Sequence, residues 1–267
     1  MNLPTDGTRA FHGQLRLVDR IEQQGGWLFH RRDVFAVVFL PLLVLALWFP
    51  GFPGDALRDA GFDHLGEVGL GVSMAGLVLR WFVVGSATAD TSGRSTRELR
   101  AAKLNTTGLY SLVRHPLYLA NAVVVAGFVA STASLWLLAV FFVAYALYIE
   151  RIAAAEERYL ESVHGDAWRA WVARTPAFVP DFAQWRPTGM RFSVRTVMRR
   201  EYNGLFGVSL AYFTLEAVRD LGVAHESLHA WLLDDDLWPI LLLAGVAVLL
   251  LLRTLKRHTR HLHVSGR

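Results

Sequence analysis

Long apolar segments separated by short polar ones constrain this chain more than any other feature. A hydrocarbon core about 30 Å thick is crossed by a helix of roughly 17–25 mostly apolar residues. Candidate spans are residues 34–49, 65–85, 116–130, 135–149, 204–218 and 237–252. Hydrophobic residues fill 53% of the 267 positions, and charged residues fill only 19%. The sequence therefore predicts an all-α fold, a polytopic membrane helix bundle of about six transmembrane helices.

Lysine and arginine are distributed unevenly among the connecting segments. Five lie in the first 32 residues, five in residues 86–115, nine in residues 150–202 and five from Arg253 onward, which makes 24 of the 27. Six spans place all of these on one side, and the opposite connections hold Arg58 and a group of acidic residues. Because basic residues accumulate on the cytoplasmic side, we expect both termini to be cytoplasmic. Anionic headgroups then account for the net charge of +4, so no nucleic-acid partner is expected.

No composition shift or repeat marks a separate soluble domain, and the first thirty residues show no signal peptide. We expect one integral-membrane domain made of a cytoplasmic N-terminal segment (1–32), a core (33–182) and a C-terminal extension with two further spans (183–267). Residues 150–164 are predicted to continue the fourth span as a helix. Asp166 is predicted to cap a short interfacial helix whose Trp168 and Trp171 anchor in the headgroup zone. Residues 191–202 are predicted to lie at the membrane interface, and the absence of cysteine excludes thiolate chemistry.

Two polar motifs flank the third and fourth apolar segments. Their chemistry-bearing residues are Gly108, Tyr110, Arg114, His115, Tyr118, Glu156 and Glu157. The predicted hairpin returns the chain to its starting side, so both motifs meet at one cytoplasmic end. Adjacent helical residues point about 100° apart, so one glutamate can bind a ligand ammonium or ribose while the other pairs with an arginine. Rings, a cation and two carboxylates suit a ligand with an amine, a carboxylate, a ribose and an adenine.

Together these motifs resemble the isoprenylcysteine carboxyl methyltransferase and phospholipid methyltransferase families of integral-membrane enzymes. The resemblance covers roughly residues 66–182 and includes Leu79-Arg80-Trp81, Gly108, Tyr110, Arg114-His115-Pro116, Tyr118, Glu156-Glu157, Leu160, Gly165 and Val179-Pro180. It implies that S-adenosylmethionine binds at the cytoplasmic end of the hairpin and that a membrane lipid acceptor approaches from the bilayer. By resemblance, the cofactor site contains Gly108, Tyr110, His115, Tyr118, Glu156 and Glu157. Arg114 and Arg80 are the catalytic candidates nearest an acidic acceptor.

Further pieces look similar to bacterial enzymes that methylate a lipid A phosphate. These pieces are Thr91–Arg94, Leu104–Gly108, Arg174–Phe178 and the two extra spans. The abundance of arginine also favours an anionic headgroup. This resemblance implies a bacterial inner-membrane protein with its site on the cytoplasmic face, and a prenylcysteine carboxylate remains an alternative acceptor. No metal and no obligate protein partner is expected.

Two other functions remain open. Membrane sterol reductases share the Arg-His-Pro-x-Tyr pattern, but a nicotinamide cofactor would need basic residues for its phosphates where this chain has Glu156 and Glu157. A non-enzymatic transporter or assembly subunit would place polar residues at mid-span. Glu216 and Arg219, three residues apart, can pair on one helix face, either as a structural pair or along an acceptor path.

Overall fold

The computed structural model describes residues 16–31, 33–48, 64–87, 103–223, 225, 227–229, 231, 237–259 and 261–264. Every regular element within these ranges is helical. They are α1 (Leu17–His30), α2 (Asp33–Trp48), α4 (Leu65–Ser86), α5 (Leu109–Leu112), α6 (Pro116–Ala130), α7 (Leu135–His164), α8 (Asp166–Val172), the 3-10 turn η1 (Phe182–Gln184), α9 (Val194–Ala217), the π-helical η2 (Val218–Val223) and α11 (Leu237–His258). The predicted helical membrane bundle is confirmed.

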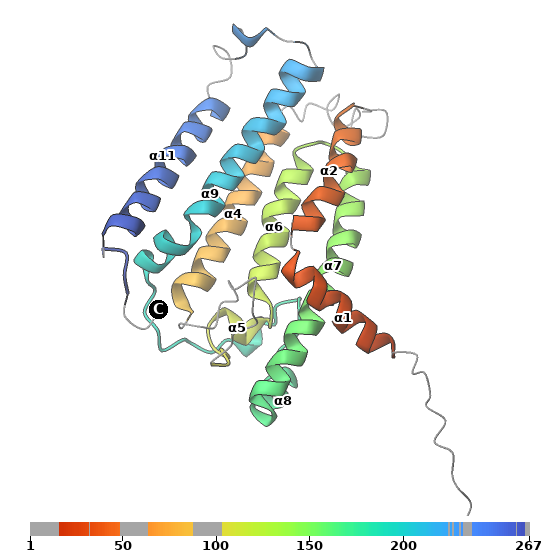
Figure 1. Cartoon of the computed structure of the whole chain (residues 1–267), viewed down its shortest axis with the longest axis vertical. Coiled ribbons are helices and arrows are strands. Elements are labelled where there is room, and N and C mark those ends of the chain that lie inside the picture. Colours follow the sequence, from red (N-terminus) through yellow and green to blue (C-terminus); the bar gives the residue numbers. More distant parts are fainter. Residues whose placement is uncertain are drawn as a thin grey trace, which may run out of the picture.

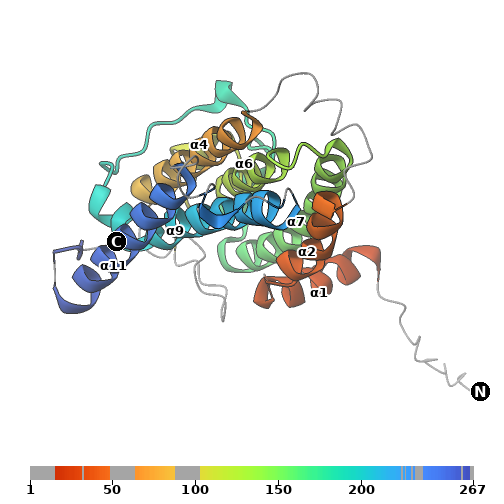
Figure 2. The same cartoon turned by 90° about the horizontal axis from the view of Figure 1, so that it is seen from above.

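The long helices stand side by side in the order α11, α9, α4, α6, α7, with α2 against α7 (Figures 1 and 2). Among the described helices, α4, α7 and α11 are long and apolar enough to cross a membrane, and α2 and α6 contain shorter apolar helices. Five of the six predicted spans begin within one residue of the observed helix, and three of these, in α2, α4 and α6, also end within one residue of it. The protein is therefore an integral-membrane protein whose helices follow the hydropathy of the sequence.

The helix that contains the fifth predicted span begins earlier than that span. Of residues 191–202, which were expected at the interface, those from Val194 onward form the first turns of α9, where the Ser193 side chain accepts from the Thr196 N–H at 3.2 Å. Thr196, Val197 and Glu201 are buried in the bundle. At 1.5 Å per residue, a 24-residue helix is about 36 Å long, and α9 carries the basic residues of its first turns within the same helix.

Small residues bring α4 and α6 into close contact. A Cβ on Gly127 would lie 2.5 Å from the carbonyl oxygen of Gly69 and 2.6 Å from Ser73 Oγ. Ser73 donates to the carbonyl oxygen of Val124 at 2.7 Å and lies 2.9 Å from the hydroxyl of Tyr212 on α9. Close backbone approach and short polar links are the usual means of joining helices in lipid, where the solvent is as apolar as leucine.

The predicted hairpin between the third and fourth spans is also confirmed. A tight turn over residues 131–134 joins α6 to α7, and Thr132 Oγ1 donates to the carbonyl oxygen of Val129 at 2.7 Å. Phe39 and Ala46 of α2 pack with Val129, Leu137 and Phe141 to form a core beside it. This core fixes α7 against α6, and α7 runs on as one helix to His164.

The N-terminal segment contains a helix that was not predicted from the sequence. α1 packs along the part of α7 beyond the span, and a Cβ on Gly25 would clash with the backbone of Arg151. Gln24 accepts from Arg151 Nε at 2.9 Å. Several residues used in the predictions lie outside the described residues, namely Arg9, Arg32, Arg58, Thr91–Arg94, Arg97, Arg100, Glu226, Asp234, Asp235 and Asp236.

Candidate functional site

Two helices carry the motif residues to one end of the bundle. Pro116 opens α6, where its missing N–H costs nothing, so Arg114 and His115 lie immediately before the first turn. α7 runs past the start of α6 and carries Glu156 and Glu157. α7 ends at His164, as predicted, and Gly165 follows it with a φ of 51°. The prediction that Asp166 caps α8 is wrong, because Asp166 is the first helical residue and Gly165 is the cap residue.

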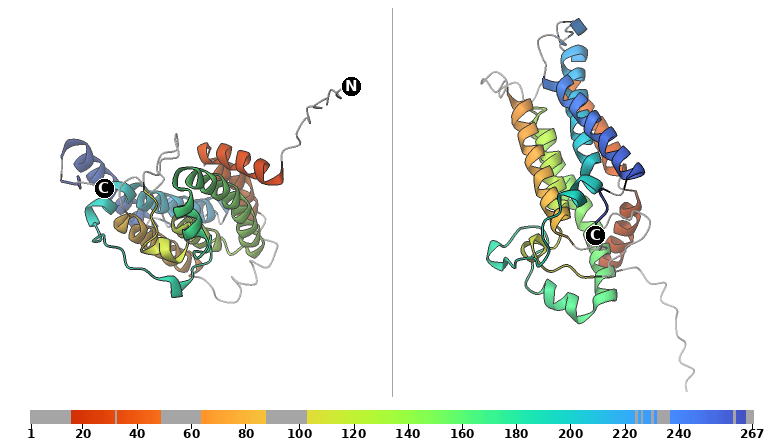
Figure 3. Two further views of the ribbon diagram at one scale, coloured as in Figure 1. Left: turned by 90° about the horizontal axis from the view of Figure 1, so that it is seen from below. Right: turned by 90° about the vertical axis from the view of Figure 1, so that its left-hand side faces the viewer.

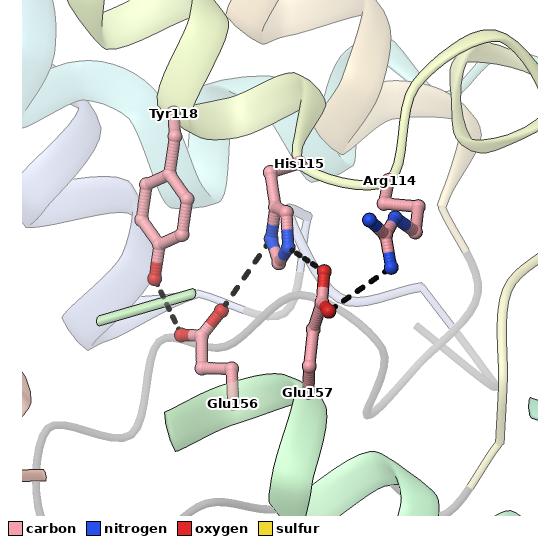
Figure 4. A network of polar contacts seen from close by, with 5 residues as sticks. All are labelled: Arg114, His115, Tyr118, Glu156 and Glu157. Atoms are coloured by element: carbon pink, nitrogen blue, oxygen red, sulfur yellow. Dashed lines mark hydrogen bonds and ion pairs between the residues drawn. The ribbon is translucent and has the colours of Figure 1, made fainter. Parts of the chain in front are cut away.

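His115 lies between the two glutamates (Figure 4). Its Nε2 is 2.9 Å from Glu157 Oε1, and its Nδ1 is 3.8 Å from Glu156 Oε2. Arg114 Nη1 donates to Glu157 Oε2 at 3.0 Å, and the Tyr118 hydroxyl donates to Glu156 Oε1 at 2.5 Å. One glutamate pairs with an arginine, as predicted. Both carboxylates nevertheless face the same group, because the imidazole occupies the angle between them.

Aromatic rings complete the surroundings of the imidazole. The rings of Tyr118 and Phe178 stack on His115, with centroids 5.5 Å and 5.6 Å away. The His115 side chain is 6% exposed, whereas the side chains of Arg114 and the glutamates are partly exposed. A neutral imidazole leaves this cluster with one surplus negative charge, because two carboxylates face one guanidinium. The cluster therefore favours a ligand that brings positive charge.

One polar atom of the cluster has no partner within the described part of the chain. Arg114 Nε is buried and makes no hydrogen bond there. An unsatisfied buried N–H costs about 1–3 kcal/mol, and more on a charged group. Arg114 therefore has a free donor beside its bond to Glu157.

Tyr110, on α5, is near enough to both Glu156 and Arg80 for their charges to act on its phenol. Burial raises the pKa of its phenol, the charge of Glu156 raises it further, and Arg80 opposes the shift. The phenol therefore stays neutral and remains a hydrogen-bond donor. Trp171 Nε1 donates to the carbonyl oxygen of Tyr110 at 3.0 Å, and Trp171 is only 3% exposed. The expectation that Trp171 is a headgroup anchor is wrong, since it fixes α8 to α5.

A mostly irregular segment, residues 176–193, whose only regular element is the 3-10 turn η1, crosses the end of the bundle from α8 to α9 (Figure 3). We call this segment the strap. Its backbone is bonded to the first motif: Arg114 N to Pro176 O, His115 N to Ala177 O, Asp181 N to Leu112 O and Gly108 N to Arg186 O, at 2.8–3.3 Å. Gly108 has a φ of 61°, a conformation that glycine adopts without strain. Arg114, residues 172–176 and residues 179–181 line an open hollow of about 570 Å³.

Arg80 belongs to a separate network. Its Nε donates to Glu201 Oε2 at 2.5 Å, and its Nη1 donates to Asn121 Oδ1 at 2.5 Å. Glu201, on α9, is 3% exposed, and Asn121 is on α6. Neither partner was predicted from the sequence. An acidic residue in a basic stretch and an amide inside an apolar segment were the available signals.

Other polar groups lie apart from these two networks. Glu216 and Arg219 form the predicted ion pair where α9 passes into η2, and Arg219 Nε also donates to Asp220 at 3.0 Å. In the part of the chain that the structure describes, no group of three His, Asp or Glu residues is arranged to hold a metal ion.

The sequence model of a family described as phospholipid methyltransferase matches residues 72–167, which include Arg80 and both polar motifs. The nickel-cobalt-cadmium resistance protein NccN of Alcaligenes xylosoxydans xylosoxydans is 32% identical over 157 residues, covering 59% of this chain and 68% of the relative. The cobalt-zinc-cadmium resistance protein CzcN of Cupriavidus metallidurans is 36% identical over 117 residues, covering 44% of this chain and about half, 49%, of the relative. No solved structure matches the chain significantly. The chain therefore belongs to the superfamily of integral-membrane methyltransferases that comprises the isoprenylcysteine carboxyl methyltransferase and phospholipid methyltransferase families.

Proposed function

We propose that this protein transfers a methyl group from S-adenosylmethionine to a lipid-like acceptor in the membrane. The observation that carries the proposal is the placement of His115 between Glu156 and Glu157, with Arg114 at its edge. The cluster has one surplus negative charge when the imidazole is neutral. S-adenosylmethionine has an ammonium, a sulfonium and a carboxylate, so its net charge is positive and complements the cluster.

The residues present fit this cofactor. Glu156 and Glu157 would accept from the ammonium or the ribose hydroxyls, and the unpartnered Nε of Arg114 would donate to a carboxylate oxygen. Gly108, Tyr110, His115 and Tyr118 would border the same site. When bound, the cofactor supplies an electrophilic methyl group on sulfur. The protein's task is then to hold donor and acceptor in line, since positioning alone supplies much of the rate of a two-reactant step.

Arginines near the site favour an anionic acceptor. A lipid phosphate, such as that of lipid A, or a prenylcysteine carboxylate is already an anion and needs no general base, whereas an amine must first lose a proton. Arg114 is the candidate contact for the anion. Arg80, whose charge is balanced by Glu201, would border the acceptor from α4. The distribution of basic residues supports a cytoplasmic location of this site. The resemblance to enzymes that methylate a lipid A phosphate supports a bacterial inner membrane.

The charge argument also separates this proposal from a reductase. A nicotinamide cofactor brings a pyrophosphate, which two adjacent carboxylates would repel. Calorimetry on the purified full-length protein should show micromolar binding of S-adenosylmethionine or its demethylated product, and none of a nicotinamide cofactor. Glu157→Gln should weaken that binding. Glu161→Gln, one turn further along α7 in an exposed ion pair with Arg169, is the matched control and should not. Binding of the nicotinamide cofactor with no heat from S-adenosylmethionine would refute the proposal.

Mass spectrometry of total lipids can identify the acceptor. Lipids from cells that express the protein should contain a species heavier by one methylene unit than its counterpart in cells with Glu157→Gln. The mass and fragmentation of that species would distinguish a phosphate ester from a carboxylate ester. Identical lipid profiles in the two strains would argue against a lipid acceptor.

The names of the two relatives favour a second, physiological proposal, a contribution to tolerance of nickel, cobalt or cadmium. Cells lacking the protein would then grow less well in these metals. Complementation by the wild-type chain but not by Glu157→Gln would connect tolerance to the candidate site. Equal growth of all strains would remove this second proposal and leave the first intact.

A further inference from the structure

A second polar hollow lies between α9 and α11, separate from the cluster around His115. Its volume is about 480 Å³, and it is lined by Tyr202 and Asn203 of α9 and by Arg253, Lys256 and Arg257 of α11. α9 starts from the strap, and α11 runs back toward the same end of the bundle (Figure 1). Both helices belong to the C-terminal extension, outside the family-matched residues 72–167.

The hollow collects positive charge that the rest of the described chain does not balance. Within the described ranges, Arg253, Lys256 and Arg257 make no ion pair with a carboxylate, and none of the lining residues is acidic. The Lys256 ammonium lies 5.3 Å from the centroid of the Tyr202 ring, which holds it toward α9. Cations in the last turn of a helix also offset its dipole. The helix dipole does not explain the position of Arg253, which lies one turn earlier. It also does not explain why Tyr202 and Asn203 line the same hollow.

The surface next to the hollow is apolar. α11 packs chiefly on α9, and Ile240, Leu243, Leu250 and Leu251 of α11 are exposed. Because α11 is apolar enough to cross a membrane, these side chains face acyl chains in a bilayer. A molecule bound here therefore meets an apolar wall along the helix and three cations at its end.

We propose that this hollow binds the phosphate group of an anionic membrane lipid. Arg253 and Arg257 offer planar donor forks that match phosphate oxygens, Lys256 adds a third cation, and Asn203 offers an amide donor. The acyl chains lie along the leucines of α11. This site is independent of the proposed methyl transfer, and its ligand is bound beside the candidate active site rather than in it.

Native mass spectrometry of the full-length protein in detergent tests the proposal. The probes are phosphatidylglycerol, phosphatidylcholine and inorganic phosphate, each added separately. The wild-type chain should retain one phosphatidylglycerol in preference to phosphatidylcholine. The triple variant R253Q/K256Q/R257Q should lose affinity about tenfold or more, since each basic residue at an anionic surface adds to the attraction. The control R16Q/R20Q/R31Q removes the same charge from α1 and the residues beside it and should retain the lipid.

A second variant, which leaves the charge of the hollow unchanged, tests the proposal even if the triple variant misfolds. Asn203→Leu keeps all three cations, and its exposed side chain leaves the fold unchanged, so weaker retention would reflect the lost amide donor. Equal retention by the wild type and the pocket variant would overturn the proposal, as would an equal loss in the pocket and α1 variants. Displacement of the lipid by inorganic phosphate, without preference between the two lipids, would overturn the assignment to a lipid and indicate a soluble phosphate.

Discussion

Arg80 on α4 and Glu201 on α9 form an ion pair, at 2.5 Å between Nε and Oε2, that joins the family-matched part of the chain to its C-terminal extension. Glu201→Gln removes the charge that balances Arg80. We expect a loss of about 1–3 kcal/mol in the free energy of unfolding, less than for a fully buried pair because Arg80 keeps some contact with solvent. Thermal unfolding in detergent measures this. Glu161→Gln, at an exposed pair with Arg169, should cost less than about 1 kcal/mol. Equal melting temperatures for both variants would contradict a structural role for the pair.

Arg114 should matter for turnover. Arg114→Ala removes a charge-assisted donor next to the proposed cofactor and acceptor, a loss of about 1.5–3 kcal/mol, or about tenfold to a hundredfold in rate. Arg114→Lys should restore only part of the activity, because an ammonium lacks the planar fork. The readout is the yield of methylated lipid per unit of protein. Full activity in Arg114→Ala would place Arg114 outside the reaction.

Gly108 should be intolerant of a side chain. Its φ of 61° is costly for alanine, and its N–H is bonded to Arg186 of the strap at 2.8 Å. Gly108→Ala should destabilise the protein by about 1 kcal/mol and weaken cofactor binding. Gly71→Ala is the control, since a Cβ there meets nothing within 4 Å and alanine favours the helix. The prediction fails if Gly108→Ala melts at or above the wild-type temperature.

Gly127 should be required for the contact between α4 and α6. A Cβ there would lie 2.5 Å from the backbone of Gly69, so alanine forces the helices apart. Overpacking of this kind costs about 1–3 kcal/mol. Gly207→Ala on α9, where a Cβ has open space, should leave the melting temperature nearly unchanged. A neutral Gly127→Ala would show that these helices separate at little cost.

Tyr110 should make the protein sensitive to high pH. Burial, with Glu156, raises the pKa of its phenol above the ordinary 10.0, because the fold favours the neutral form. The resulting stability is fully present below pH 10 and is lost as the pH rises toward the raised pKa. Wild type should therefore lose more stability above pH 10 than Tyr110→Phe. Ultraviolet titration gives a second readout, since removal of Tyr110 should leave the amplitude near the ordinary phenol pKa unchanged.

Much of the fold could be predicted from the sequence, because lipid forces apolar segments into helices and the hairpin turn is short. The position of Glu156 and Glu157 opposite Arg114 and His115 follows from the same hairpin. The roles of Glu201 and Asn121 do not, because each pairs with Arg80 on α4, and no short turn joins α4 to α6 or to α9. α1 was missed because its helix is stabilised against α7 through Gly25, a residue that disfavours helices locally. Trp171 was misassigned because its indole bonds a backbone carbonyl of α5, which periodicity cannot reveal.

The backbone bonding of the strap has a consequence for the diversity of such proteins. The four main-chain bonds from residues 176–186 to residues 108–115 do not depend on which side chains the strap carries. The backbone of the strap is thus held in place independently of its side chains. Val179 and Phe182, both 77% exposed, can be substituted without moving the backbone that supports Arg114 and His115. Substitutions during evolution can therefore alter the exposed surface of the strap while the polar cluster beside it stays the same.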